Sequence, residues 1–235
     1  MTFLFFQTPD TVHKIIDTAK NAAQTAAADQ EIRFGDLLIK GGWVMVPIGI
    51  LAVLGLVIFF ERYFTIRKAS KDDANLMVQI RASILSGNLE SAKALARNSN
   101  NPLGRMLQKG LLRIGRPIKD IEGAIENVGK LEVSKLEKNI GILGIVAGIA
   151  PMFGFLGTII GVIKIFFDIS KTDNFSIGTI SGGLYVKMIT SAAGLMVGIV
   201  AYVGYHILNM MVDKIILRLE TDAIEFIDLL EEPSK

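Results

Sequence analysis

The chain has 235 residues, of which 51% are hydrophobic and 20% charged, and its formal net charge is +2. This small charge, with no basic stretch interleaved with aromatic residues, argues against a nucleic-acid-binding protein. The absence of cysteine excludes disulfides and thiolate metal or redox sites. The only histidines, His13 and His206, are too far apart in sequence to form a metal cluster, so we expect no metal site and no cofactor.

Residues 1–40 precede the first long apolar run. They lack the basic start and the long apolar core of a signal peptide, although Thr25 to Ala28 could be read as a small-residue cleavage site. The other interpretation, which we favour, is an amphipathic surface helix from Thr8 to Ala28. Its apolar side would carry Val12, Ile15, Ile16 and Ala19.

Three runs are apolar and almost free of charged residues: 41–61, 139–167 and 179–212. A bilayer core about 30 Å thick needs roughly 20 apolar residues in a helix, so each run is long enough to cross it. The sequence therefore predicts an all-α membrane protein with three transmembrane helices.

The distribution of positive charge predicts the orientation of these spans. Residues 62–138 contain fifteen Lys and Arg, whereas the first 42 residues contain four. By the positive-inside rule, 62–138 forms a cytoplasmic helical domain. Residues 1–40 and the short loop 168–178 are then periplasmic, and residues 213–235 form a cytoplasmic C-terminal helix.

Within the cytoplasmic segment the pattern predicts helices over 74–85 and 89–97, with Asn88 as the cap of the second. A third helix starts at Pro102, which suits a first helical position. From Pro117 an amphipathic pattern continues into the second span, which predicts one unbroken helix over 117–167, roughly 75 Å long. The third span also continues past Val212 as an apolar stripe, so two of the three helices should extend far into the cytoplasm.

Small residues recur at helical spacing in the second and third spans and allow membrane helices to approach closely. The residues expected to serve helix packing are Pro151, Gly154, Gly157, Gly161, Gly194 and Gly198. Three hydroxyls lie near the middle of these helices, on Thr158, Thr190 and Ser191. They could line a polar path, or they could bond back to their own helices and serve packing alone.

No Asp or Glu lies inside the spans, apart from Glu61 and Asp168 at their ends. A proton path normally uses titratable groups at depth, so a proton-conducting role would require a carboxylate from another polypeptide. His206, near the cytoplasmic end of the third span, is expected to be an interfacial residue. Lys187, about two turns into the third span, either extends its ammonium to the outer interface or is a functional intramembrane charge.

Several of these residues resemble signatures of the ExbB/TolQ/MotA family of proton-driven inner-membrane motor proteins, and of ExbB most closely. The string from Ala150 to Thr158 resembles the family's A-P-x-x-G-L-L-G-T motif, and the string from Thr190 to Leu195 resembles its third-span T-A-x-G-L motif. Glu61-Arg62 and the segment from Gly87 to Ala92 also match. The likeness covers about residues 40 to 230.

The resemblance implies a homopentamer whose second and third spans surround a pore holding single-span ExbD- or TolR-like subunits. One such subunit would carry the proton-accepting aspartate, beside Thr158 and Ser191. The implied function is a proton-channel stator subunit that uses the proton motive force to energise TonB-dependent outer-membrane transport, through a TonB-like protein. The chain departs from many relatives at Val186-Lys187, where they have a glutamate.

Other functions remain open. A TolQ-type role in envelope integrity or a MotA-type role in motility would use the same membrane chemistry, and a non-conducting membrane scaffold would use the hydroxyls for packing only. Anionic lipids are further expected partners, at the basic cytoplasmic edge. An enzyme is not expected, because the sequence offers no nucleophile–base pair, phosphate loop or metal cluster.

Overall fold

The computed structural model describes residues 42–70, 75–171 and 177–231, and every regular element within these ranges is an α-helix. Three helical stretches among the described residues are long and apolar enough to cross a membrane: Met45–Ala69, Ile118–Lys171 and Ile180–Glu231. The predicted all-α fold with three candidate membrane helices is therefore confirmed. The amphipathic helix predicted for residues 1–40 lies outside the described residues.

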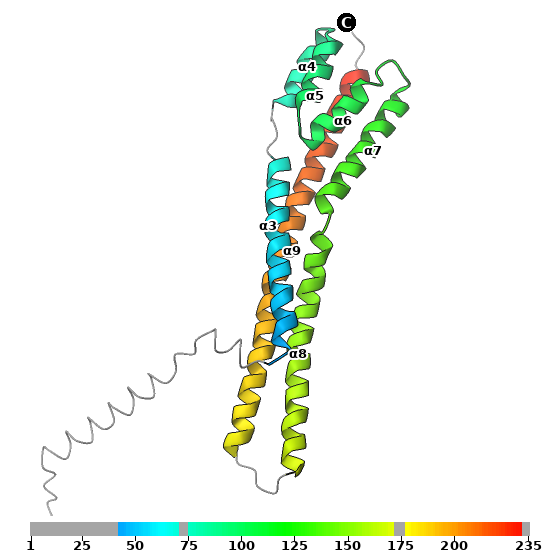
Figure 1. The fold of residues 1–235 in the computed structure, drawn as a ribbon. Coiled ribbons are helices and arrows are strands. Elements are labelled where there is room, and N and C mark those ends of the chain that lie inside the picture. Colours follow the sequence, from blue (N-terminus) through cyan, green and yellow to red (C-terminus); the bar gives the residue numbers. More distant parts are fainter. Residues whose placement is uncertain (1–41, 71–74, 172–176, 232–235) are drawn as a thin grey trace, which may run out of the picture.

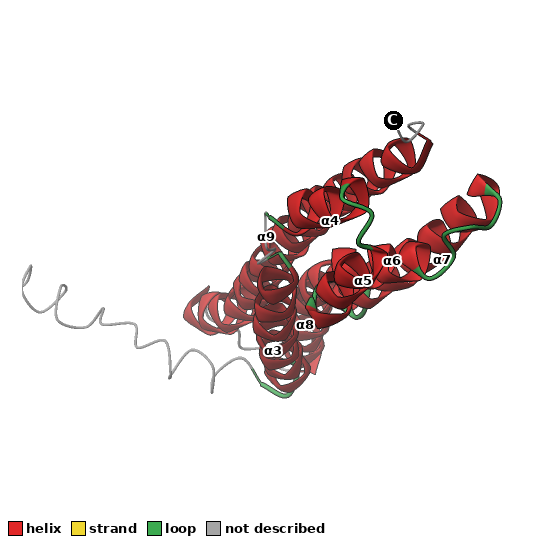
Figure 2. Cartoon of the chain, turned by 90° about the horizontal axis from the view of Figure 1, so that it is seen from above, coloured by secondary structure: helices red, strands yellow, loops and turns green. Residues whose placement is uncertain are grey.

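The molecule is long and narrow because its two longest helices run antiparallel to each other (Figure 1). Helix α8 (Ile140–Lys171) packs along the first part of α9 (Ile177–Glu231), and α3 (Met45–Ala69) packs against both. Viewed along the helices, these three form one cluster (Figure 2). Helix α9 is continuous over its whole length, roughly 80 Å, so the long third helix predicted from its apolar stripe is observed.

Helix α3 covers only part of the α8–α9 pair. Met45 and Ile48 in its first turn, and Val44 just before it, pack with Phe153 of α8 and with α9. Toward its other end, Phe59 lies against Gly204 of α9. The α8 and α9 segments nearest residues 171 and 177 continue past the start of α3 (Figure 1).

At the opposite end there are three short helices, α4 (Leu76–Leu85), α5 (Leu89–Asn98) and α6 (Pro102–Leu111). Helices α4 and α6 contact α9, and α5 packs against α4 and α6. The Asn88 cap is confirmed, because its side-chain oxygen accepts a hydrogen bond of 3.0 Å from the Ser91 backbone N–H. Asn101 caps α6 in the same way, accepting from Gly104 at 2.6 Å. Both caps satisfy backbone donors that a helix start leaves without partners.

The expected unbroken helix over 117–167 is wrong. Helix α7 (Ile118–Glu137) ends before α8 begins, and Asn139 between them has a φ of 65°. Asparagine tolerates this left-handed conformation better than most residues, because its short polar side chain can bond locally. The hydrophobic pattern continues across so short a break, so periodicity alone did not reveal it.

A side chain from α3 stabilises the broken end of α7. The last carbonyls of a helix lack intrahelical donors. The Arg62 guanidinium, which is buried, donates to one of them, the Lys135 carbonyl, at 3.4 Å, and also pairs with Glu61. Arg62 therefore ties the end of the first membrane helix to the junction of α7 and α8.

A buried carboxylate ties α6 to α7. Glu132 is 3% exposed and accepts hydrogen bonds from Arg105 and Lys135. Burial by itself raises the pKa of the Glu132 carboxyl, but the hydrogen bonds and charges of Arg105 and Lys135 outweigh it and hold that pKa below its ordinary value.

The left-handed backbone at Asn139 yields a stability prediction. Replacing Asn139 by Val should lower the free energy of unfolding by about 1–2 kcal/mol, because a β-branched residue fits this conformation poorly. Asn139→Gly, the matched control, should unfold at or above the wild-type temperature, measured by circular dichroism of the detergent-purified protein. Equal melting temperatures of Asn139→Val and the wild type would contradict the left-handed backbone conformation at Asn139.

The Glu132 cluster yields a pH prediction. Because the folded pKa lies below the unfolded value of about 4.3, the carboxylate contributes stability above that value and loses it as the pH falls through the folded pKa. At pH 7, Glu132→Gln should reduce stability by about 1–2 kcal/mol, since both cationic partners are partly in solvent. The difference in melting temperature between the wild type and Glu132→Gln should become smaller when the pH falls below about 4.

The exposed Glu126–Lys130 pair supplies the control for this experiment. Glu126→Gln should change the unfolding free energy by less than about 1 kcal/mol at either pH. A Glu132→Gln variant that behaves like Glu126→Gln at pH 7 would show that the buried cluster does not stabilise the fold.

Candidate functional site

The closest approach of α8 and α9 occurs at glycines. A Cβ on Gly194 would lie 2.6 Å from the Ala150 carbonyl oxygen, and one on Gly154 would lie 3.0 Å from the Ser191 carbonyl oxygen. A Cβ on Gly198 would collide with the Pro151 ring. Side chains at these positions would push the helices apart, so the glycines set the distance between the two backbones.

Two of the three hydroxyl residues flank this contact. Thr158 donates a hydrogen bond of 3.0 Å to the carbonyl oxygen of Gly154, one turn earlier on α8. Gly154 itself packs on the backbone of Ser191. Thr158 and Ser191 are both partly buried, and Gly154 links them across the helix pair. Since the proton of Thr158 is used within its own helix, the lone pairs of its oxygen are available to an incoming donor.

Thr190 occupies a different environment. Its side chain is fully buried, and its methyl group would lie 2.9 Å from a Cβ on Gly157. The same Cβ would lie 3.1 Å from Val44, which precedes α3. Thr190 therefore faces the three-helix interior, on the side of α3, whereas Thr158 and Ser191 are partly accessible.

The contact with Val44 also locates the hydroxyls along the membrane helices. Gly157 and Thr190 lie near the middle of α8 and within the first half of α9, yet they are level with the start of α3. Along α3, the distance from Trp43 to Arg62 is roughly 28 Å, close to the thickness of a bilayer core. The hydroxyls are therefore level with the start of α3 rather than with its middle.

Lys187 lies across Gly161. A Cβ on Gly161 would collide with the Lys187 methylenes, so the absent side chain leaves room for the lysine stem. The Lys187 ammonium reaches to 4.0 Å from a Cβ position on Gly42, the residue before Trp43. Lys187 lies within the first part of α9, and its ammonium is level with the residue that precedes Trp43.

His206 is exposed on α9 and packs edge-on against Tyr202, with ring centroids 4.3 Å apart. It lies about four turns from Ser191 along α9.

The sequence has no Asp or Glu between 139 and 167 or between 179 and 212. Within the described residues, no group of three or more His, Cys, Asp or Glu could hold a metal ion. Any proton acceptor beside Thr158 and Ser191 therefore has to come from outside these spans.

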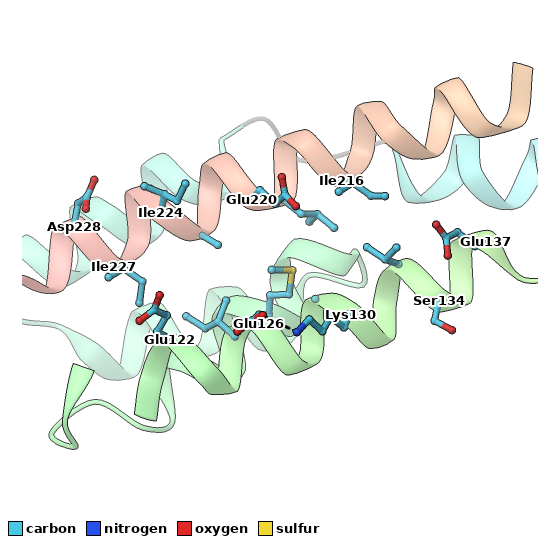
Figure 3. A pocket seen from close by; sticks show the side chains of 16 residues that line it. Glu122, Glu126, Lys130, Ser134, Glu137, Ile216, Glu220, Ile224, Ile227 and Asp228 are labelled. Carbon is cyan, nitrogen blue, oxygen red and sulfur yellow. Dashed lines mark ion pairs between the residues drawn. The ribbon is translucent and has the colours of Figure 1, made fainter. Parts of the chain in front are cut away.

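Sequence analysis missed an open groove of about 750 Å³ between α7 and the far part of α9. Its floor is apolar and includes Met106, Ile125 and Leu219, while its rim carries carboxylates, with Lys130 paired to Glu126 (Figure 3). The rim carboxylates are Glu122, Glu126, Glu137, Glu220 and Asp228. The apolar stripes in the sequence predict an apolar face on each of α7 and α9. They do not predict that the two helices diverge and leave a groove between these faces.

The described residues form helices only, three helical stretches among them could span a membrane, and the two that pack at the glycines carry hydroxyls but no carboxylate between 139 and 167 or between 179 and 212. The model of the MotA/TolQ/ExbB proton channel family matches residues 98–221. The chain therefore belongs to this family.

Curated relatives agree with this assignment. An ExbB homolog of Methanothermobacter thermautotrophicus, named a biopolymer transport protein, is 26% identical over 194 residues, covering 82% of this chain and 67% of the relative. An ExbB-like biopolymer transport protein of Synechocystis sp. is 29% identical over 191 residues, covering 76% and 72%. The Tol-Pal system protein TolQ of Haemophilus influenzae is 30% identical over 97 residues, or 41% of each chain.

The glycine contacts predict a large effect from a single methyl group. Gly194→Ala should destabilise the protein by about 1–3 kcal/mol, because the new Cβ meets backbone atoms that cannot rotate away. Gly49→Ala in α3 is the matched control, since a Cβ there has no neighbour within 4 Å. Thermal unfolding in detergent measures both. Equal melting temperatures of Gly194→Ala and Gly49→Ala would contradict the close packing of α8 on α9 at Gly194.

Proposed function

We propose that this chain is the proton-channel subunit of an inner-membrane motor, with several copies surrounding single-span partner subunits. The observation that carries the proposal is that the Thr158 hydroxyl bonds to Gly154, which packs on the backbone of Ser191, in two spans without any carboxylate. Membership of a proton channel family supports it. A pentamer with an ExbD- or TolR-like partner is the assembly that we propose.

In this assembly residues 62–138 and 213–235 lie in the cytoplasm, and residues 1–40 and 168–178 in the periplasm. The excess of Lys and Arg in 62–138 supports this orientation. Trp43 and Arg62 then mark the outer and inner ends of the first span. Transmembrane helices 41–61, 139–167 and 179–212 enclose the proton path.

The mechanism follows from the hydrogen-bonding capacity of the hydroxyls. A protonated carboxyl on the partner helix can donate to the Thr158 oxygen, whose own proton is held by Gly154. This bond favours the neutral form of the partner, which can then shift within the ring of subunits. A charge that crosses the membrane field gains about 2.3 kcal/mol per 100 mV. This free energy is enough for one proton to bias one shift of the partner helix.

The Lys187 ammonium lies at the start of α3 and outside this path. Its stem is held on Gly161 and its charge lies near Gly42, so it need not oppose a proton at Thr158. A lysine at the interface keeps its charge in water at little cost, unlike one at the bilayer centre.

We propose that the motor energises TonB-dependent outer-membrane transport, through a TonB-like protein. The relatives named as ExbB biopolymer transport proteins support this role. A TolQ-type role in envelope integrity is the second candidate, supported by the likeness to TolQ of Haemophilus influenzae. Co-purification of this chain with a TonB-like or with a Tol-Pal protein distinguishes the two roles.

The hydroxyl of Thr158 can be tested by an isosteric change. Thr158→Val should reduce proton flux through the partner-containing complex roughly tenfold, because one hydrogen bond worth about 1–1.5 kcal/mol is lost. Thr158→Ser should retain most of the flux. The measurement is acidification of proteoliposomes loaded with a pH-sensitive dye, under an imposed potential.

Thr65→Val is the matched control, because Thr65 makes the same bond to its own helix, at 2.8 Å to the Glu61 carbonyl, but lies at the end of α3. Its flux should equal that of the wild type. Undiminished flux in an assembled Thr158→Val complex would refute the role given to this hydroxyl.

A further inference from the structure

The face of α9 that carries Ser191 continues toward the Arg62 end of the membrane helices. Tyr202 comes eleven residues after Ser191, and His206 comes fifteen residues after it. At about 100° per residue, they lie about 20° and about 60° around the helix from Ser191. Both side chains are exposed in the subunit, and α9 is unbroken over this stretch. One face of one helix therefore carries a hydroxyl, a phenol and an imidazole.

The imidazole of His206 points away from α3. Gly204 packs against Phe59 of α3, and His206 follows Gly204 by two residues, or about 200° around the helix. The same contact sets the height of His206. Helices α3 and α9 run in the same direction, so the residue two positions after Gly204 is level with the residues that follow Phe59 by two or three, Glu61 and Arg62. His206 therefore lies at the end of the first span.

The candidate hydroxyls open on the same side of the subunit as this imidazole. Gly157 and Thr190 face the start of α3. Thr158 and Ser191 each follow one residue later, about 100° farther around their helices, and both are partly accessible. A partner helix that lies beside the two accessible hydroxyls is therefore on the side of α9 to which the imidazole points.

His206 has a chemical capacity that no other residue of these two spans has. Between 139 and 167 and between 179 and 212 it is the only histidine, and there is no Asp, Glu or Cys. Histidine is the only side chain whose charge ordinarily changes between about pH 5 and 8. Its ring can bind a proton on one nitrogen and release one from the other. Hydroxyl groups can orient a proton donor near neutral pH, but they do not hold an additional proton.

Aromatic rings rather than charges surround the imidazole. The rings of Tyr202 and Tyr205 pack edge-on against it, with centroids 4.3 Å and 5.2 Å away. Tyr205 also lies against Gly144 of α8, which is the neighbouring helix on that side. That helix has no charged residue from Ile140 to Ile163. The tyrosines therefore hold the ring in place without supplying a charge that would fix its protonation state.

The charged groups at this level come from three places. Glu61 and Arg62 of α3 pair with each other, on the far side of α9 from His206. Lys138 lies at the junction before α8. Asp213 is exposed on α9, two turns beyond His206 and only about 20° from it around the helix. The group that continues the His206 face out of the span is therefore a carboxylate, which can accept protons.

We infer that His206 is the group through which protons leave the motor toward the cytoplasm. The partner's carboxyl releases its proton to water on the open side of α8 and α9, and water carries it over the roughly 22 Å along α9 from Ser191 to His206. One ring nitrogen binds this proton, so an N–H bond forms as the bond from that hydrogen to a water oxygen breaks. The other nitrogen releases its proton to water or to the Asp213 carboxylate, and the ring is neutral again.

This inference rests on the proposed function and adds the exit group to it. The test measures proton flux into proteoliposomes that hold the complex with its partner, under an imposed potential. His206→Gln keeps a polar side chain but cannot take up a proton. At about pH 8 its flux should be roughly tenfold below the wild type, a smaller loss than the about 10²–10⁴ of an enzymatic proton-transfer group, because water at the membrane edge replaces part of its role.

The matched control is Ile207→Gln. Ile207 is next to His206, 37% exposed, and about 100° farther around the helix. It receives the same new side chain at the same height but on another face of α9. Flux through the Ile207→Gln complex should equal that of the wild type.

The pH dependence of flux supplies a readout that a merely structural role would not change. The pH is set equal on both sides of the membrane and varied from about 5 to about 8. Near pH 5 a histidine is mostly protonated and cannot accept a further proton, so the wild type and His206→Gln should conduct equally. The ratio of wild-type flux to His206→Gln flux should then rise to roughly ten near pH 8. The ratio of wild type to Ile207→Gln should stay near one.

A ratio that does not change with pH, or His206→Gln flux equal to that of the wild type throughout, would overturn the inference and leave the proposed function intact. Native electrophoresis identifies the assembled complexes in which this comparison is made. His206→Asn is the second variant and should behave like His206→Gln, because it also lacks a titratable group. Wild-type flux in His206→Asn would show an effect of side-chain shape and would also overturn the inference. A wild-type complex without proton flux would overturn both the inference and the proposed function.

Discussion

The close packing of α8 on α9 at three glycines is the contact on which the rest of this structure depends. Inside a bilayer no hydrophobic driving force brings helices together, so backbone approach and dispersion must do so. Gly154, Gly194 and Gly198 meet backbone or ring atoms directly, and this fixes the height of one helix against the other. The packing of Gly154, which accepts the Thr158 hydrogen bond, on the backbone of Ser191 follows from that fixed register.

Much of the architecture could be predicted from the sequence, because its causes are local. The three spans follow from long runs without charge, the length of α9 from an apolar stripe that continues past Val212, and the Asn88 cap from residue type and position. The break at Asn139 could not be predicted in this way, since it changes the backbone of two residues without interrupting the hydrophobic pattern. The groove between α7 and α9 depends on how two distant segments diverge.

The candidate site shows the same division. Residue type and spacing singled out Thr158, Ser191 and the glycines, but the level of these residues in the membrane depends on where α3 packs. Lys187 illustrates this point. In the sequence it is a costly charge inside a span, whereas in the fold its stem lies in the space left by Gly161 and its ammonium is level with Gly42. In the orientation that we propose, this contact makes Lys187 a boundary residue rather than an intramembrane charge.

In the assembly that we propose, this subunit provides walls and hydrogen-bond acceptors for a proton, and the partner provides the residue that carries it in the membrane. The most direct test is native mass spectrometry of the complex extracted from membranes with its partner genes intact. The account predicts several copies of this chain, five in the proposed ring, together with a single-span chain that has an acidic residue in its membrane helix. A monomer, or an oligomer that contains this chain alone, would contradict it.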